Sequence, residues 1–197
     1  MRIIKNPVER KKELIIAANE LFMSNGYEKT TVEDIINKVG VAKGCFYHYF
    51  GSKKEIFEVC IYGLSESIFK SYLDIFTDNN KKAKQKLIDY IDYNFKLAQE
   101  EHSTNIFESI HSDTFERMHE RIIQDSINQI IPTFIQLLEQ GIEEGDFNVI
   151  SAEFTAIALL GAFEQIHAQL SQNYKGDVNK QYELVIDLME RLLQTKF

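Results

Sequence analysis

The stretch that decides the fold is residues 30–50, which reads TTVEDIINKVGVAKGCFYHYF. In its first half, apolar residues recur with the period of a helix and would share one face. They are Val32, Ile35, Ile36 and Val39. Gly40 then ends this helix, because glycine readily adopts the left-handed backbone found at helix ends. A second short helix, about residues 42–49, follows almost without a gap. The stretch therefore predicts two short helices joined by a tight turn, a helix-turn-helix arrangement.

A longer helix precedes this stretch. Asn6 and Pro7 offer an N-cap residue followed by a proline at the first helical position. Its apolar face then recurs at helical spacing. The face consists of Leu14, Ile15, Ala18, Leu21 and Phe22. The dipeptide Asn25-Gly26 is expected to end this helix.

Two capping boxes mark further helix starts. A Ser or Thr followed three residues later by Glu can satisfy two free backbone N–H groups at the start of a helix. Thr30 with Glu33, and Ser52 with Glu55, have this spacing. One helix is therefore expected to start at Thr30 or Thr31, and another just after Ser52.

From residue 53 onward the pattern is helical to the end. The expected helices are 53–77, 82–101, 104–111, 115–144, 151–174 and 179–195. Pro132 falls inside the longest of these and is expected to kink or split it. The sequence thus predicts an all-α protein of about nine helices, without a convincing strand.

Composition agrees with a globular helical chain. Only two prolines and nine glycines in 197 residues favour long helices, and 44% apolar residues favour a folded core. Cys45 and Cys60 cannot make a disulfide framework. The N-terminus has no signal-peptide core, and the longest apolar run, 156–163, is too short to span a bilayer. We therefore expect a cytoplasmic protein with no membrane association.

Charge is distributed unevenly along the chain. The net charge of −8 taken alone argues against a nucleic-acid partner. Residues 1–55, however, carry ten Lys or Arg and seven Asp or Glu, a net charge of +3, whereas residues 56–197 carry 12 and 23, a net charge of −11. Such asymmetry is typical of a DNA-facing end joined to an end that DNA repels.

The residues around the turn are more specific than a generic helix-turn-helix. The runs 26–35, 39–50 and 52–57 resemble the DNA-binding domain of the TetR/AcrR repressor family. Residues 15–22 resemble the first helix of that family. The resemblance is dense over roughly residues 10–60, and beyond them only the length and the helical pattern agree.

This resemblance implies a domain organisation and a function. Residues 1–52 would form a three-helix DNA-binding domain, and residues 53–197 a larger helical domain for ligand binding and dimerisation. The protein would be a homodimeric DNA-binding transcriptional regulator, a repressor released from a palindromic operator in double-stranded DNA by a small-molecule inducer. No cofactor is expected.

The resemblance also implies which residues contact DNA. Thr31, and with it Thr30, would present a hydroxyl to a phosphate, and Lys53 would hold another phosphate. The full set is Thr30, Thr31, Val41, Ala42, Lys43, Gly44, Tyr47, His48 and Lys53. The family often has Ser or Thr where this chain has Ala42. The recognition helix is therefore expected to begin without a hydroxyl cap, which costs about 1 kcal/mol of local stability.

The larger domain contains aromatic and polar residues on shared helical faces. A mostly apolar pocket with a few polar groups is what a small ligand needs, and the resemblance places an inducer in this region. The candidate ligand-binding residues are Asn94, Phe107, Glu108, His111, Phe134, Phe163 and His167.

The last two helices are expected to form a dimer interface. Small residues on one helix permit close approach, and an apolar stripe follows the other. The candidate interface residues are Ala158, Gly161, Ala162, Gln165, Tyr182, Val185 and Met189. The alternative is that these faces only pack inside one subunit.

Other classes of function are weighed against this interpretation. The histidine spacings match no compact metal site, so no metal is expected. No nucleophile–base arrangement, carboxylate pair or phosphate loop indicates an enzyme. A helical protein–protein adaptor whose helix-turn-helix no longer reads DNA is the main alternative. An activator, or a repressor without a ligand, also fits the pattern.

Overall fold

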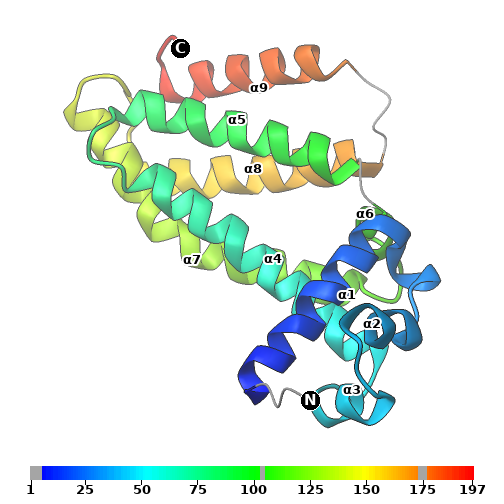
Figure 1. The fold of residues 1–197 in the computed structure, drawn as a ribbon. Coiled ribbons are helices and arrows are strands. Elements are labelled where there is room, and N and C mark those ends of the chain that lie inside the picture. Colours follow the sequence, from blue (N-terminus) through cyan, green and yellow to red (C-terminus); the bar gives the residue numbers. More distant parts are fainter. Residues whose placement is uncertain (1–5, 103–104, 173–176) are drawn as a thin grey trace. The chain divides into compact units, whose positions relative to one another are not determined.

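The computed structural model describes residues 6–102, 105–172 and 177–197, and the regular secondary structure of these residues is helical throughout (Figure 1). The prediction of an all-α protein is confirmed. The described helices are α1 (Pro7–Lys29), α2 (Val32–Val39), α3 (Lys43–Tyr49), α4 (Lys53–Phe76), α5 (Ala83–His102), α6 (Ile106–Ile110), α7 (Glu116–Glu143), α8 (Ala152–Gln172) and α9 (Val178–Leu193).

The chain divides into two compact units. One consists of Met1–Ser67 with Glu100–Ile123, and the other of Ile68–Gln99 with Gln124–Phe197. Helix α4 therefore contributes to both units, as does α7. The functional boundary expected between residues 52 and 53 remains a prediction about domains, and it does not coincide with this structural division.

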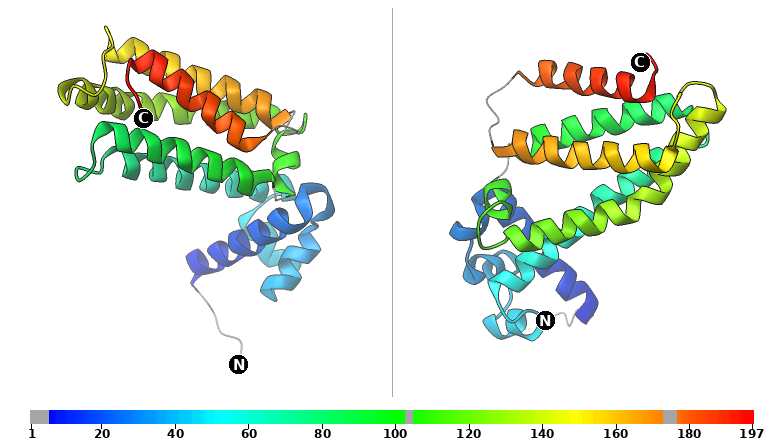
Figure 2. Two further views of the ribbon diagram at one scale, coloured as in Figure 1. Left: turned by 90° about the horizontal axis from the view of Figure 1, so that it is seen from above. Right: turned by 180° about the vertical axis from the view of Figure 1, so that it is seen from behind.

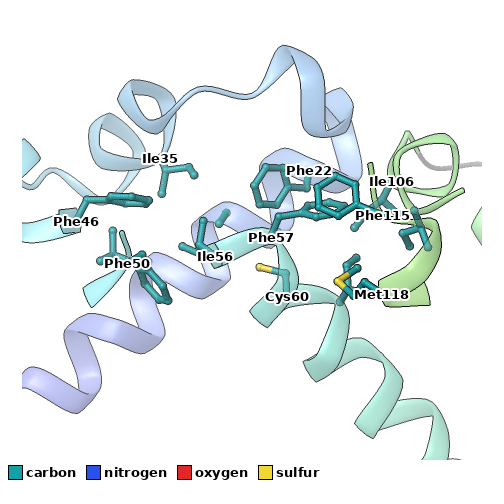
Figure 3. Packing of buried hydrophobic residues seen from close by; sticks show 14 of the residues in the cluster. Phe22, Ile35, Phe46, Phe50, Ile56, Phe57, Cys60, Ile106, Phe115 and Met118 are labelled. Carbon is teal, nitrogen blue, oxygen red and sulfur yellow. The ribbon is translucent and has the colours of Figure 1, made fainter. Parts of the chain in front are cut away.

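The first unit is built around an aromatic core (Figure 3). The ring of Phe57 from α4 lies edge-on to Phe22 of α1, with 4.9 Å between ring centroids, and 4.5 Å from the ring of Phe115. Helices α2 and α3 add Ile35 and Phe46, both fully buried. The apolar spacing that predicted α1 and α2 thus corresponds to their core faces.

Helix α1 does not stop at Gly26 as the sequence suggested. Gly26 has φ 78° and ψ 169°, a conformation for which glycine is suited, and a last helical turn follows it to Lys29. The kink brings α6 against α1: the backbone N–H of Asn105 donates to the carbonyl of Met23 at 3.1 Å. A Cβ at Gly26 would lie 3.1 Å from the carbonyl oxygen of Asn105.

The second unit is a bundle of the end of α4, α5, most of α7, α8 and α9. Figures 1 and 2 show α5, α8 and α9 running roughly side by side. Its core draws on all of these helices. The fully buried members are Ala83, Leu87, Phe134, Leu138, Ala156, Leu159, Met189 and Leu193.

A buried lysine caps the C-terminal end of α4 in this unit. Lys86 is 3% exposed, and its Nζ donates to the carbonyl oxygen of Phe76 at 3.0 Å and to Oε1 of Gln140 at 2.8 Å. The ammonium therefore sits at the C-terminal end of α4, where the helix dipole favours a cation.

Pro132 is expected from the sequence to kink or split its helix, and in the structure it does not split α7. The helix runs without interruption from Glu116 to Glu143. A proline inside a helix removes one backbone hydrogen bond, at a cost of about 3 kcal/mol. Burial of the neighbouring Ile130 and Phe134 offsets this cost through tertiary packing.

The described helices were compared with the length and apolar character that a bilayer-spanning helix needs. None of these described helices has both the length and the apolar character to span a bilayer.

Gly141 of α7 provides a test of the packing in the second unit. A Cβ at this position would lie 2.0 Å from the ring of buried Phe147. We expect Gly141→Ala to lower the free energy of unfolding by about 1–3 kcal/mol through overpacking. Urea denaturation at one fixed protein concentration measures this change.

Gly63→Ala is the matched control, because Gly63 also lies within a helix but its Cβ would meet nothing within 4 Å. This variant should gain about 0.5–1 kcal/mol from reduced backbone entropy. Equal stability of the two variants would contradict the packing of Phe147 on α7.

Candidate nucleic-acid interface

Of the two starts expected for helix α2, the structure has the later one. Thr31, not Thr30, is the N-cap: its Oγ1 accepts from the backbone N–H of Asp34 at 3.1 Å. The Asp34 carboxylate accepts in return from the N–H of Thr31 at 2.8 Å. The capping box is therefore Thr31 with Asp34, and the expected pairing of Thr30 with Glu33 is wrong.

The turn between α2 and α3 depends on Gly40. This residue has φ 73° and ψ 42°, the left-handed conformation, and its N–H donates to the carbonyl of Ile36 at 2.8 Å. The N–H of Val41 donates to the same carbonyl at 3.0 Å. The turn is thereby closed within two residues, and α3 starts almost at once, as expected.

Helix α3 has one buried and one exposed face. Phe46 is fully buried, and Phe50, which follows the helix, is 1% exposed. The opposite face lies in solvent and contains Ala42, Lys43, Gly44, Tyr47 and His48. Ala42 is the N-cap and makes no side-chain capping bond, as expected for alanine. The structure thus gathers most of the predicted DNA-contacting residues on a single exposed surface.

Thr30 is a correction to that predicted set. Its side chain is 0% exposed, and Oγ1 donates to the carbonyl of Gly26 at 2.8 Å and to that of Leu21 at 3.3 Å. The hydroxyl therefore completes hydrogen bonds across the kink of α1 and is unavailable to a phosphate. Thr31 is exposed, its hydroxyl bonds to Asp34 in the α2 cap, and its phosphate contact stays a prediction.

Lys53 is engaged inside the protein in this conformation. Its Nζ donates to the carbonyl of Tyr27 at 2.7 Å and lies 4.1 Å from the centroid of the Tyr27 ring. Glu28 offers a second carbonyl at 3.4 Å. Lys53 thus caps the end of α1, and a phosphate would have to share or replace these contacts. Its phosphate contact stays a prediction.

An ion pair joins α2 to α3 on the exposed surface. Nζ of Lys43 lies 2.7 Å from Oε1 of Glu33. The hydrogen bond from the ammonium lowers the pKa of Glu33, and the same bond raises the pKa of Lys43. Sequence reasoning placed Glu33 in a capping box and did not identify its pair with Lys43, because a contact ten residues apart depends on how the two helices cross.

Cys60, one of the two cysteines, lies in the core of the first unit. Burial raises the pKa of its thiol to about 12, so the reactive thiolate is disfavoured at neutral pH. Its Sγ is 3.7 Å from the carbonyl oxygen of Ile15. Cys45 on α3 is partly exposed.

Three of the predicted ligand-binding residues meet around one tyrosine of the second unit. The rings of Phe134 and Phe163 lie 6.0 and 5.9 Å from that of Tyr90. Asn94 donates to the Tyr90 carbonyl at 2.7 Å and accepts from the Tyr72 hydroxyl at 2.8 Å. Burial raises the pKa of Tyr90 well above its ordinary value, and its hydrogen bond with Asn94 partly offsets this.

The other ligand candidates are not brought to this cluster. His111 belongs to the first unit, is exposed, and lies 4.6 Å from the ring of His119. The side chains of Phe107, Glu108 and His167 lie outside the described part of the structure. Among the side chains that are described, no three His, Cys, Asp or Glu residues form a group suited to a metal ion.

The predicted dimer residues fall into two groups. Ala158, Gly161 and Gln165 are exposed on α8, and Ala162 is partly exposed. On α9, the structure corrects the prediction. The side chains of Val185 and Met189 are buried in the core of their own chain.

Tyr182 is also engaged within its own chain. It packs against the same core and donates its hydroxyl to Asp92 at 2.7 Å. The α9 stripe therefore packs largely inside the protomer, which was the alternative considered for these faces.

The structure reveals exposed apolar residues that the sequence prediction missed. On α8 and α9 these are Phe154, Ile157 and Leu184, whereas the exposed Leu192 belongs to the apolar stripe that was expected along the last helix. Helical spacing from Ala158 and Gly161 would have indicated Phe154 and Ile157, which share their face. For α9, only packing shows which side of the stripe faces outward.

Comparison with known proteins places the helix-turn-helix in a family. The sequence model described as "Bacterial regulatory proteins, tetR family" matches residues 14–60. The chain is 30% identical over 142 residues to the HTH-type transcriptional repressor KstR2 of Mycobacterium tuberculosis, an alignment that covers 70% of this chain and 69% of that protein.

Solved structures share the fold. A TetR-family transcriptional regulator from Mesorhizobium loti superposes with a TM-score of 0.74 at 16% identity, covering 96% of this chain and 98% of that one. RolR in complex with the ligand resorcinol superposes with a TM-score of 0.62 at 14% identity, covering 96% and 89%. At these identities the likeness concerns the fold alone.

The corrected role of Thr30 leads to a stability prediction. Thr30→Val keeps the side-chain volume but leaves two carbonyls without their donor. We expect the free energy of unfolding to fall by about 1–2 kcal/mol, as measured by urea denaturation.

Thr77→Val is the control, because the Thr77 hydroxyl is exposed and bonds within its own turn. It should change stability by no more than about 0.5 kcal/mol. A Thr30→Val protein of wild-type stability that no longer bound DNA would return Thr30 to the contact set.

Proposed function

The chain belongs to the TetR family of bacterial regulatory proteins, and from this premise we propose that it is a homodimeric transcriptional repressor. It binds a palindromic operator in double-stranded DNA and leaves the operator when a small molecule binds its helical domain. Members of the family are DNA-binding regulators of transcription, and the relative KstR2 is named as a repressor.

The exposed face of α3 carries the proposal. A helix fits the major groove of B-form DNA, where side chains near its start reach base edges. Lys43 and Tyr47 project from this face, while Phe46 fixes the opposite face in the core. Gly44 has open space around its Cβ position, which leaves room for close approach of the backbone.

The distribution of charge along the chain also supports docking of the α3 end on DNA. The net charge of +3 over residues 1–55 attracts the phosphate backbone, and the net charge of −11 over residues 56–197 opposes any other docking. Lys43, Tyr47 and His48 in the groove would be joined by Thr31 at the start of α2. This set combines base-edge groups with phosphate-binding groups.

Exposed apolar residues on α8 and α9 support a dimer. Phe154 is 75% exposed and Leu184 is 60% exposed, values that are unfavourable for large apolar side chains in water. Small Ala158 and Gly161 lie on the same helix as Phe154 and allow close packing. Two copies of α8 and α9 would form a four-helix interface. Two-fold symmetry then presents two α3 helices to two half-sites.

Regulation by a ligand is proposed for the helical domain. The aromatic cluster around Tyr90, with Asn94 as a polar group, has the chemistry of a site for a small, largely apolar molecule. The fold neighbour RolR was solved with resorcinol bound. A ligand acts only through its different affinity for the two states, so ligand and operator weaken each other's binding by the same factor.

Alanine variants of α3 test DNA binding. Lys43→Ala and Tyr47→Ala should each weaken binding to a duplex that the wild-type protein binds by about tenfold or more, because each removes a base or phosphate contact. Fluorescence anisotropy measures the affinities. Lys70→Ala removes an exposed lysine from α4 and should bind like wild type.

Dimerisation should survive both α3 variants. If DNA affinity were unchanged in Lys43→Ala and Tyr47→Ala, the helix-turn-helix would not be reading DNA. The adaptor function would then be preferred.

The interface is tested by placing a charge on it. Phe154→Glu and Leu184→Glu should raise the dimer dissociation constant by about 100-fold, through lost apolar burial and an unpaired charge at the interface. Sedimentation velocity measures the change. Ile16→Glu is the control, since Ile16 is also an exposed apolar residue but lies on α1. If both Phe154→Glu and Leu184→Glu left the dimer dissociation constant unchanged, the dimer would use another surface.

A further inference from the structure

Lys43 and Glu33 form an exposed ion pair on the surface that carries the proposed DNA contacts. Their side chains are 57% and 60% exposed, and Nζ lies 2.7 Å from Oε1. The pair connects the first turn of α3 to the first turn of α2. Exposed ion pairs contribute little to folding stability. The pair's effect on what Lys43 can bind is therefore the more consequential one.

Glu33 differs from its neighbour Asp34 in what it does locally. Asp34 accepts from the backbone N–H and the hydroxyl of Thr31, so its carboxylate is part of the α2 cap. Glu33 has no part in that capping box, and its side-chain carboxylate accepts a hydrogen bond from Lys43. Removing the Glu33 charge therefore leaves the α2 cap in place.

The pair limits how Lys43 can meet DNA. A lysine ammonium has three N–H donors on a flexible four-carbon stem. Glu33 on α2 accepts a hydrogen bond from one of these donors, which leaves two donors for other partners. A phosphate competing for the ammonium would have to displace Glu33 and would also face its negative charge.

The hydrogen bond to Glu33 and the negative charge of its carboxylate affect the binding of specific and of non-specific DNA unequally. Non-specific affinity comes from phosphate contacts, so a lysine restrained by a carboxylate adds little to it. In a matched major groove, the remaining two donors would be available to a base edge with the bond to Glu33 kept. The carboxylate thus restricts one mode of binding and leaves the other open.

We propose that Glu33 is a specificity-determining positioning residue, which holds Lys43 for base contact and suppresses its use as a general phosphate ligand. The inference rests on the proposed DNA-binding function. It assigns to Glu33 a role in selecting the operator over random sequence.

The test compares the full-length wild-type protein with Glu33→Gln, Lys43→Ala and the double variant. Two probes of equal length are used: a duplex enriched from a random pool by the wild-type protein, and a random-sequence duplex. Affinities are measured over a series of salt concentrations. Glu20→Gln is the matched control. It removes a carboxylate from another exposed lysine pair of the same unit, with Lys38 at 2.8 Å.

Glu33→Gln should bind the random duplex about two- to fivefold more tightly, within the range of an exposed ion pair. The log–log salt slope on that duplex should steepen by about one, because one more lysine neutralises a phosphate. Affinity for the enriched duplex should change less, so the ratio of the two affinities falls. In the Lys43→Ala background, Glu33→Gln should no longer change this ratio. Glu20→Gln should leave the ratio at its wild-type value.

Two results would overturn the inference. Equal tightening on both duplexes would mean that Glu33 exerts only a general charge effect. An undiminished effect of Glu33→Gln in the Lys43→Ala background would mean that Glu33 acts on DNA directly. Failure of the proposed function is seen earlier and separately, as a wild-type protein that enriches no sequence.

Discussion

The arrangement of the DNA-facing surface depends on the burial of Phe46 and Phe50. Helix α3 is only seven residues long and lacks a side-chain cap at Ala42, so it is too short to be stable by itself. Its orientation comes from Phe46, which packs 5.7 Å from Phe50 in the core of the first unit. Because that face is fixed inward, Lys43 and Tyr47 are fixed outward. The same apolar contacts that fold the unit thereby determine which side chains DNA can meet.

A set of polar contacts complements this core at the end of α1. Gly26 allows a kink, Thr30 supplies hydrogen bonds across it, and Lys53 caps the last turn. The N–H of Tyr27 also donates to Oγ of Ser109 in α6 at 3.0 Å. Thr30 and Lys53, which the sequence predicts as DNA ligands, therefore stabilise the end of α1, and Lys53 links it to α4, while Tyr27 links it to α6. The exposed pair of Lys43 and Glu33 lies outside this network and so remains free to affect binding.

The sequence predicted the helix-turn-helix well because its signals are local. Periodic apolar residues, Gly40 at the turn and Pro7 at the first helical position act over a few residues, and the helices lie close to where they were expected. It failed where tertiary packing decides. A helical period shows that Val185 and Met189 share a face, but it does not show whether that face meets its own chain or a second copy. The ligand pocket is harder still, since aromatic residues that pack a core and those that line a pocket have the same composition.

The most direct test of the central claim is selection of bound sequences from a random duplex pool, followed by salt titration of the enriched duplex. We expect a pseudo-palindrome, as a two-fold dimer requires, with half-sites about one helical turn or a multiple of it apart. We also expect a log–log salt slope that reflects several phosphate contacts. Absence of any enriched sequence, with only weak binding that salt abolishes uniformly, would contradict the claim that α3 reads an operator.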